Sequence, residues 1–400
     1  MTTSTTPILF TPIRLGKLLL KHRIAMAPLT RHRCDENGVP TDLVVKHYEQ
    51  RATEGGLLIS EATGISNNAG HYPYTPGIFT EKQIEGWQKV TSAVHQKKGI
   101  IYLQLWHLGR TTHSFLLPSN QQVVSASPIR IVGDPLSPLD LPYETPRALT
   151  IDEILSITQD YAKAAKNAII AGFDGVELHS SIGYLLDQFI CTSSNQRTDQ
   201  YGGLIENRVR FTLEVVDAIV EAIGAERTAV RFSPFNSYQD MHDDTPIETW
   251  SYLTQQLQKN HPNLAYLHFV EPRDIDDDDE GEDKNKDKEE QHGNKNNKTK
   301  EKEKDDDDSK NWSLDPFRTI WKGPFIVAGG YTHDYKLAYE TTEMHSNTIV
   351  AFGRAFIANS DLVYRIQHHL PFNKYDRSTF YTPCTGKGYN DYPLFSQPMK

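Results

Sequence analysis

The stretch DGVELHSSIGYLLDQF at residues 174–189 is the part of the sequence from which the fold follows. Its first part, Asp174 to Leu178, is a short apolar run that predicts a buried strand. The segment before it, Asp152 to Ala171, has the apolar period of a helix and begins with the capping-box pattern Thr150 to Glu153. Strands that alternate with helices in this way are typical of a parallel sheet.

The same alternation recurs along the chain. Another helical stretch, Glu206 to Ile223, places Val209, Leu213 and Val216 on one face. Eight strand–helix units in a chain of 400 residues predict an α/β fold of the closed (β/α)8 TIM-barrel type. A doubly wound open sheet is the alternative, but no GxGxxG motif follows the first strand. The predicted strands are Ile24–Ala27, Leu57–Glu61, Ile101–Trp106, Gly175–Leu178, Thr228–Phe232, Tyr266–Val270, Phe325–Ala328 and Thr348–Phe352.

Two further segments lie outside the eight repeats. The stretch Leu9 to Arg23, with Gly16-Lys17 in its middle, predicts a small hairpin that plugs the barrel floor. The loop after the third strand, Thr111 to Pro146, is long and proline-rich, and loops of this length often carry function.

The charge of the chain is concentrated in one segment. The net charge at pH 7 is −10, and residues 274–310 hold 17 acidic and 9 basic side chains, so the rest of the chain is nearly neutral. This low-complexity insertion has almost no apolar residue to bury, and we therefore expect it to be disordered within a single domain of residues 1–400. It interrupts the loop after the sixth strand, on the active-site side of a barrel. One interpretation is a tolerated surface insertion, and the other is a lid or docking tail.

Composition disfavours several classes of function. No stretch approaches the ~20 apolar residues of a membrane helix, and the first residues lack the regions of a signal peptide. Cys34, Cys191 and Cys384 are scattered, which disfavours a disulfide framework, an iron–sulfur cluster or a zinc site. We therefore predict no metal and a cytoplasmic location. An acidic chain without an evident basic face is also a poor candidate for binding nucleic acid.

A histidine and a tyrosine follow the fourth strand five positions apart. His179 can donate a hydrogen bond to a carbonyl and Tyr184 can donate a proton, which together suit the reduction of a conjugated double bond. Ile182 lies between them, where a second polar donor would help. The candidates for an aromatic pocket around them are Tyr72, Trp106, Phe380 and Tyr381.

Other strand ends predict a cofactor site. Gly329-Gly330 follow the seventh strand and Gly353-Arg354 follow the eighth, where barrels usually hold phosphate. Glycines let backbone N–H groups approach an anion, and arginine adds charge-assisted hydrogen bonds. Gln104 and Arg231 suit a heterocycle with an imide edge that becomes anionic on reduction, and flavin is the obvious candidate.

Several long motifs, all in the same order, resemble the old yellow enzyme family and especially its fungal branch. The motifs are SNQRTDQYGGLIENR at residues 194–208, MAPLT at 26–30, LQLWHLGR at 103–110, EPR at 271–273 and NKYDR at 373–377. The likeness runs from about Pro7 to Tyr392 and fails only across the charged insertion.

The resemblance implies a TIM barrel that binds FMN non-covalently, is reduced by NADPH, and then reduces activated alkenes. Flavin N5 gives hydride to the β carbon, and Tyr184 is implied as the residue that protonates the α carbon. His179 is implied as one half of a pair that binds the carbonyl or phenolate oxygen. The residues implied to contact the flavin are Pro28, Leu29, Thr30, Ala62, Gln104, Arg231, Gly329, Gly330, Gly353 and Arg354. Those implied for the substrate pocket are Tyr72, Trp106, His179, Ile182, Phe380 and Tyr381.

Three departures from the family pattern limit the transfer of function. Ile182 stands where the family has Asn or His, and loss of one oxyanion donor typically costs roughly 10²–10³ in rate. Ala62 replaces a glycine commonly found near the flavin carbonyl. The insertion at 274–310 replaces the loop after the sixth strand, which in relatives borders the substrate and the nicotinamide.

The sequence is compatible with three functions. The first is an NADPH-dependent FMN ene-reductase acting on α,β-unsaturated carbonyl compounds. The second is a flavoprotein that binds phenols or steroids and turns over alkenes poorly because of Ile182. The third is a regulatory or stress-response interactor that works through the insertion. The sequence leaves open the physiological substrate, the stereochemical preference and the oligomeric state, a homodimer included.

Overall fold

The computed structural model describes residues 6–133, 139, 141–272 and 312–395. The insertion predicted at 274–310 lies outside the described residues, so its disorder and its role stay predictions.

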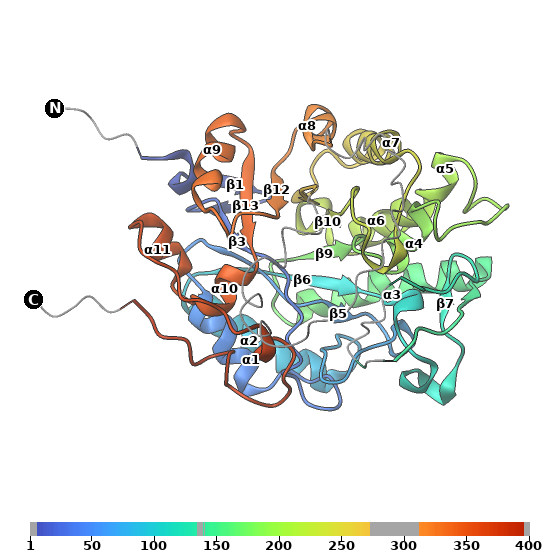
Figure 1. Cartoon of the computed structure of the whole chain (residues 1–400), viewed down its shortest axis with the longest axis horizontal. Coiled ribbons are helices and arrows are strands. Elements are labelled where there is room, and N and C mark those ends of the chain that lie inside the picture. The colour runs from blue at the N-terminus through green and yellow to red at the C-terminus, as the bar shows by residue number, and fades with distance from the viewer. Residues whose placement is uncertain (1–5, 134–138, 140, 273–311, 396–400) are drawn as a thin grey trace, which may run out of the picture.

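Eight parallel strands form a closed barrel (Figure 1). Their order around the barrel is β4-β3-β13-β12-β11-β10-β9-β6, and the pairing of β4 with β6 closes the ring. The predicted TIM barrel is thereby confirmed and the open sheet is excluded. The strands are β3 (Ile24–Met26), β4 (Leu57–Ile59), β6 (Ile100–Trp106), β9 (Gly175–His179), β10 (Thr228–Phe232), β11 (Tyr266–Val270), β12 (Phe325–Ala328) and β13 (Thr348–Phe352). Two short strands, β7 (Val124–Ser125) and β8 (Arg147–Ala148), pair outside the barrel, and β5 (Thr63–Gly64) pairs with the end of β6.

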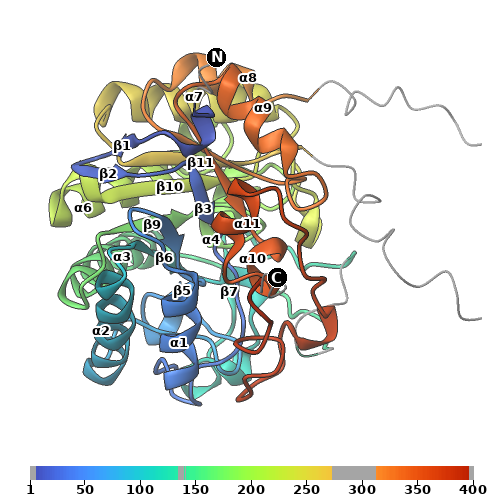
Figure 2. The ribbon, with the colours of Figure 1, turned by 90° about the vertical axis from the view of Figure 1, so that its left-hand side faces the viewer.

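Helices surround the barrel, as Figures 1 and 2 show. The longer ones are α1 (Asp42–Arg51), α2 (Glu81–Gln96), α3 (Ile151–Ile170), α6 (Arg210–Ile223), α7 (Pro246–Asn260) and α9 (Lys336–Met344). The shorter ones are α4 (Leu185–Ile190), α5 (Ile205–Arg208), α8 (Asp315–Ile320), α10 (Arg354–Ala358) and α11 (Leu362–Gln367). In Figure 2 the red C-terminal segment runs beside the blue α1, where the Asn390 side chain donates to the Leu43 carbonyl at 2.9 Å.

Helix α3 begins as predicted. The Thr150 hydroxyl accepts from the Glu153 N–H at 3.2 Å, and the Glu153 carboxylate accepts from the Thr150 N–H at 2.8 Å. The single helix predicted over Glu206 to Ile223 is wrong, because it is divided at Val209 into α5 and α6. Val209 and Val216 are buried as the pattern predicts, whereas Leu213 is only half-buried and Phe211 and Val215 also enter the core.

The N-terminal hairpin closes the floor of the barrel. Strands β1 (Ile13–Leu15) and β2 (Leu18–Leu20) pair antiparallel, and the turn between them uses Gly16 at φ +56°. Leu15 and Leu20 are fully buried and pack with residues from the first halves of the barrel strands, including Tyr102. The predicted plug is therefore confirmed, and the opposite end, where the strands finish, is the mouth of the barrel.

Candidate active site

The strand registers bring polar residues of neighbouring strands side by side at the mouth. His179 on β9 lies level with Arg231 on β10, and Arg231 lies level with His268 on β11. Gln104 on β6 lies level with Glu177 on β9. In the order of strands around the ring, β12 stands opposite β6 and β13 stands opposite β9. A ligand that contacts both the glycine-rich ends of β12 and β13 and the polar ends of β6 and β9 must therefore span the mouth.

His179 and Tyr184 lie against each other. Their ring centroids are 4.7 Å apart, with the rings inclined at 71°. Trp106, at the end of β6, packs edge-to-face against Tyr184 at 5.0 Å. The Leu185 N–H donates to the His107 carbonyl at 3.1 Å, which ties the start of α4 to the loop after β6. The imidazole and the phenol are thus close enough to reach one ligand.

Burial fixes the protonation states of both side chains. Desolvation, followed by the neighbouring Arg231 and His268, holds the pKa of His179 well below its usual range. Desolvation also raises the pKa of the Tyr184 phenol, and the nearby Tyr238 and Tyr143 raise it further. Near neutral pH the pair is therefore a neutral imidazole and a protonated phenol, which can donate a hydrogen bond and a proton respectively.

Ile182 adopts an unusual backbone conformation. Its φ is +54°, in the left-handed region that β-branched residues avoid, and Gly183 follows at +78°. The Ile182 N–H donates to Ser233 Oγ at 2.7 Å. With its amide turned so that the nitrogen faces them, the Gln239 side chain donates to the carbonyls of Ile182 and Gly183 at 3.2 and 3.1 Å. The loop keeps a shape that Asn or Gly would adopt with less strain, while its side chain offers no hydrogen bond.

Aromatic side chains form one wall of the mouth. Trp106 and Tyr72 pack at 5.6 Å and belong to a buried cluster with Ala62. The Tyr72 hydroxyl already donates to the Thr111 carbonyl at 2.9 Å. Phe380 is buried, whereas Tyr381 is 58% exposed and lies at the rim. Tyr72 and Trp106 therefore come together, and the His32 ring links Tyr72 to Tyr381 at the edge. Phe380 packs against Tyr381 and Tyr375.

Two buried arginines fasten the segment that carries Phe380. The Arg31 guanidinium donates to the carbonyls of Phe380 at 3.1 Å and Gly388 at 2.8 Å. Arg33 donates to the carbonyls of Thr385 at 3.0 Å and Thr379 at 2.8 Å. Arg31 directly follows the MAPLT motif and Arg33 lies two positions further on, so the loop after β3 positions a wall residue more than 340 residues away in sequence.

A buried polar network orients Gln104. Its side-chain nitrogen donates to Glu177 Oε1 at 2.8 Å, and His268 Nδ1 lies 2.8 Å from Glu177 Oε2. Burial alone would raise the pKa of Glu177, but His268, Arg231 and Gln104 together lower it, so the group is a carboxylate. With its amide nitrogen held in this way, Gln104 has its amide oxygen left to accept from an imide N–H.

The ends of β12 and β13 fit a phosphate group. Gly330 has φ +77°, and a side chain built on it would meet no atom within 4 Å. A side chain on Gly353 would touch only Leu29, at 3.4 Å, which places the loop after β3 beside this cradle. The Arg354 guanidinium lies 5.9 Å from the Tyr375 ring centroid. The open space beside Gly330 and Gly353 lets backbone N–H groups approach a phosphate, and the Arg354 guanidinium can add a charge-assisted hydrogen bond.

The remaining predicted flavin contacts lie at the ends of β3 and β12. Pro28, Leu29 and Thr30 are half-buried directly after β3, and β3 pairs with β13. Gly329 has φ +130° at the end of β12. The predicted residues therefore line two facing parts of the mouth, and their contacts to a flavin stay a prediction.

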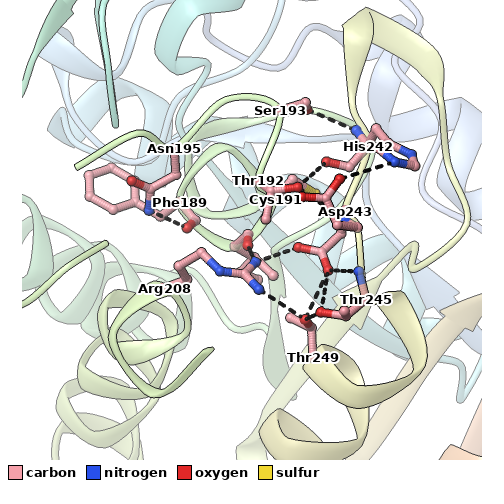
Figure 3. A network of polar contacts seen from close by, with 12 residues as sticks. Phe189, Cys191, Thr192, Ser193, Asn195, Arg208, His242, Asp243, Thr245 and Thr249 are labelled. Atoms are coloured by element: carbon pink, nitrogen blue, oxygen red, sulfur yellow. Dashed lines mark hydrogen bonds and ion pairs between the residues drawn. The ribbon is translucent and has the colours of Figure 1, made fainter. Parts of the chain in front are cut away.

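The longest motif of the resemblance lies outside the mouth and has a structural role (Figure 3). Arg208 donates to the Asp243 carboxylate and, at 3.2 Å, to Thr249 Oγ1. The Asn195 side chain donates to the Phe189 carbonyl at 2.6 Å. These contacts fasten the segment after α4 to the start of α7.

Sequence reasoning missed several residues that shape the site. Gln239 and Ser233 hold the Ile182 loop from the loop after β10, and Ser181 contacts the His179 ring. Of these residues, Ser181 is the one that the sequence could have indicated, because it lies within the stretch 174–189, two positions after His179. Nothing local to Gln239 points to Ile182, because the contact joins two separate loops.

The described residues contain neither a candidate membrane-spanning helix nor a candidate metal-binding cluster. Within them, no helix combines the length and apolar character that crossing a membrane requires. No group of three or more His, Cys, Asp or Glu side chains among them is arranged to hold a metal ion.

The chain is similar in sequence to a family of flavin oxidoreductases. A family model described as the NADH:flavin oxidoreductase / NADH oxidase family matches residues 8–312 and 291–373. The 12-oxophytodienoate reductase 1 of Oryza sativa subsp. japonica is 43% identical over 389 residues, covering 97% of this chain and 93% of that protein. A flavin oxidoreductase of Emericella nidulans is 45% identical over 400 residues, covering 96% of this chain and 97% of that protein.

Solved structures agree with the sequence comparison. Morphinone reductase in complex with tetrahydroNAD superimposes with a TM-score of 0.83 at 40% identity, covering 98% of each chain. Old Yellow Enzyme from Pichia sp. gives a TM-score of 0.82 at 35% identity, covering 98% of this chain and 95% of that one.

Proposed function

The chain belongs to the NADH:flavin oxidoreductase / NADH oxidase family and, within it, to the old yellow enzymes; from this premise we propose that it is an ene-reductase that uses FMN and NADPH to reduce α,β-unsaturated carbonyl compounds. The observation that carries the proposal is the contact of His179 with Tyr184 beside Trp106 at the barrel mouth. Flavin and a nicotinamide reductant follow from the family, whereas the choice of NADPH and of small enones is our proposal.

Each side chain has a definite task in this proposal. His179 holds the substrate oxygen, whose negative charge grows during the reaction. Tyr184 gives a proton to the α carbon from its half-buried, protonated phenol. Bound FMN would supply the hydride. Gln104 and Arg231 would bind its pyrimidine edge, and Gly330, Gly353 and Arg354 would bind its phosphate.

Ile182 makes the substrate site asymmetric. In this proposal the imidazole donates to the substrate oxygen, and Ile182, at the position of the family's second donor, has an aliphatic side chain that cannot donate. Loss of one oxyanion donor typically costs roughly 10²–10³ in rate, so we expect alkene reduction to be slow compared with relatives that have two donors.

We also propose a reducing, cytosolic environment for the protein. Its three cysteines are free, with Cys34 and Cys191 buried and Cys384 exposed. Free thiols without partners are typical of compartments in which disulfides do not persist.

The test follows the flavin absorbance in two steps under anaerobic conditions. NADPH, or NADH in a parallel experiment, is expected to bleach the flavin, and 2-cyclohexenone is expected to restore it. Bleaching without restoration would contradict the ene-reductase and support a phenol- or steroid-binding flavoprotein. A colourless protein that takes up no added FMN would remove the flavin assignment altogether.

A further inference from the structure

Ser181 is in contact with the ring of the residue that holds the substrate oxygen. Its Oγ lies 3.0 Å from Nδ1 of His179. Ser181 is fully buried and His179 is 4% exposed, so water does not compete for this hydrogen bond. No described residue forms a hydrogen bond with His179 Nε2, and this nitrogen is not among the fully buried polar atoms that lack a partner, so it is open to the pocket.

The direction of this hydrogen bond follows from an account of the buried donors. Burial lowers the pKa of His179, so the imidazole is neutral and carries a single N–H. If Nδ1 carried the proton, the Ser181 hydroxyl would accept from it, and its own O–H would be a buried donor with no acceptor among the described residues. If Ser181 donates to Nδ1, the buried hydroxyl is used, and the remaining N–H lies on Nε2, which is open to the pocket and can donate to a ligand. An unsatisfied buried donor is costly, so the second arrangement is favoured.

We propose that Ser181 is a positioning residue, which donates to Nδ1 of His179, keeps the proton on Nε2 and holds the ring toward the pocket. The inference rests on the proposed function for the identity of the ligand, an enone or phenolate oxygen. It gives this chain a feature that offsets Ile182, since the single remaining donor is held in one tautomer and one orientation.

The adjacent Ser180 provides a matched control. It is also fully buried, but its Oγ lies 3.4 Å from Oγ1 of Thr212 on α6 and therefore on the outer side of the strand. Ser180→Ala removes the same hydroxyl from the same strand end without touching His179.

The direct test is 15N NMR of the imidazole nitrogens in FMN-loaded protein, with the His179 signals assigned by their loss in His179→Gln. The wild type is expected to carry the proton on Nε2. In Ser181→Ala the Nδ1 resonance is expected to move toward that of a ring nitrogen without a hydrogen bond, whereas in Ser180→Ala it stays. A proton on Nδ1 in the wild type, or an unchanged Nδ1 resonance in Ser181→Ala, overturns the proposal. The readout needs no turnover, so failure of the ene-reductase assignment would be seen separately.

A second measurement separates positioning from general damage. The long-wavelength absorption of oxidised FMN is titrated with 4-chlorophenol to give its Kd. Ser181→Ala is expected to weaken binding about tenfold, the equivalent of one typical hydrogen bond. Ser181→Thr, which keeps a hydroxyl, is expected to restore binding, and Ser180→Ala is expected to leave it unchanged. Equal Kd values for Ser181→Ala and the wild type, or equal losses in Ser181→Ala and Ser180→Ala, would contradict the proposal.

Discussion

With its amide nitrogen turned toward the loop between the two predicted catalytic residues, the Gln239 side chain donates to the main-chain carbonyl of Ile182 at 3.2 Å, and so joins that loop to the loop after β10. Ser233 accepts from the N–H of the same residue at 2.7 Å. Both main-chain polar groups of Ile182 are therefore satisfied while its φ stays at +54°. The surrounding loops hold a β-branched residue in a conformation that costs roughly 1–2 kcal/mol for most side chains.

Replacement of Ile182 by Asn is expected to improve both stability and rate. Asn tolerates the left-handed region, so the free energy of unfolding in urea should rise by about 1 kcal/mol. Its amide also adds a second donor, so reoxidation of the reduced enzyme by 2-cyclohexenone should accelerate by roughly 10²-fold. Ile182→Val keeps the branched, apolar side chain and should change neither quantity. A faster but less stable Asn variant would separate the two effects and disprove the strain argument.

Tyr184→Phe is expected to affect one half-reaction only. The variant lacks the proton that the α carbon needs, so reoxidation by the enone should slow by roughly 10²-fold or more. Flavin reduction by NADPH should keep its rate, because no proton from this phenol is used there. Stopped-flow absorbance gives both rates. Tyr143→Phe, which removes a neighbouring phenol, serves as the control, and a similar loss in that variant would argue against Tyr184 as the donor.

The attachment of the C-terminal segment can be tested at Arg33. Its guanidinium is buried and donates to the carbonyls of Thr385, Thr379 and Phe380. Arg33→Gln should lower the free energy of unfolding by about 2–3 kcal/mol, since hydrogen bonds from a charged group are lost. Hydrogen exchange in residues 377–389 should also accelerate. Arg14→Gln, at an exposed position on β1, should change neither. Protection of 377–389 that is unaltered in Arg33→Gln would contradict this role.

Asp187 should make stability depend on pH. Burial raises the pKa of its carboxyl from 3.8 to about 7, although the Gly183 N–H, donating at 2.8 Å, lowers it. Because the folded-state pKa lies above the unfolded one, the native state binds more protons between these values. Stability should therefore fall as pH rises from about 4 to about 7, by at most about 1.4 kcal/mol per pH unit for this group.

Asp187→Asn removes this titration and keeps an acceptor for the Gly183 N–H. Its stability advantage over the wild type should grow from pH 4 to pH 7 and then level off. Glu61, whose pKa burial also raises to about 7, titrates in both proteins and cancels in the difference. Urea unfolding at each pH gives the measurement, with the exposed Asp152→Asn as control. An advantage that does not change with pH would show that the carboxyl of Asp187 does not titrate in this window.

The sequence predicted the barrel well because its signal is local. Each buried strand is a short apolar run between polar turns, and four of the predicted strands, such as Thr228–Phe232 and Thr348–Phe352, have the observed bounds. The capping box at Thr150 was predicted for the same reason, since it needs only residues three positions apart. The break at Val209 was not predicted, because it accompanies contacts of Arg208 with Asp243 and Thr249 in a later part of the chain.

The sequence by itself determined which residue types follow each strand, and therefore the candidate set around His179, Tyr184, Gln104 and the glycine pairs. It could not determine how these side chains are held. The tertiary structure decided that Gln239 supports Ile182, that Arg31 and Arg33 place Phe380, and that Glu177 orients Gln104. The physical reason is that periodicity and capping depend on neighbours along the chain, whereas buried hydrogen bonds depend on which loops the closed barrel brings together.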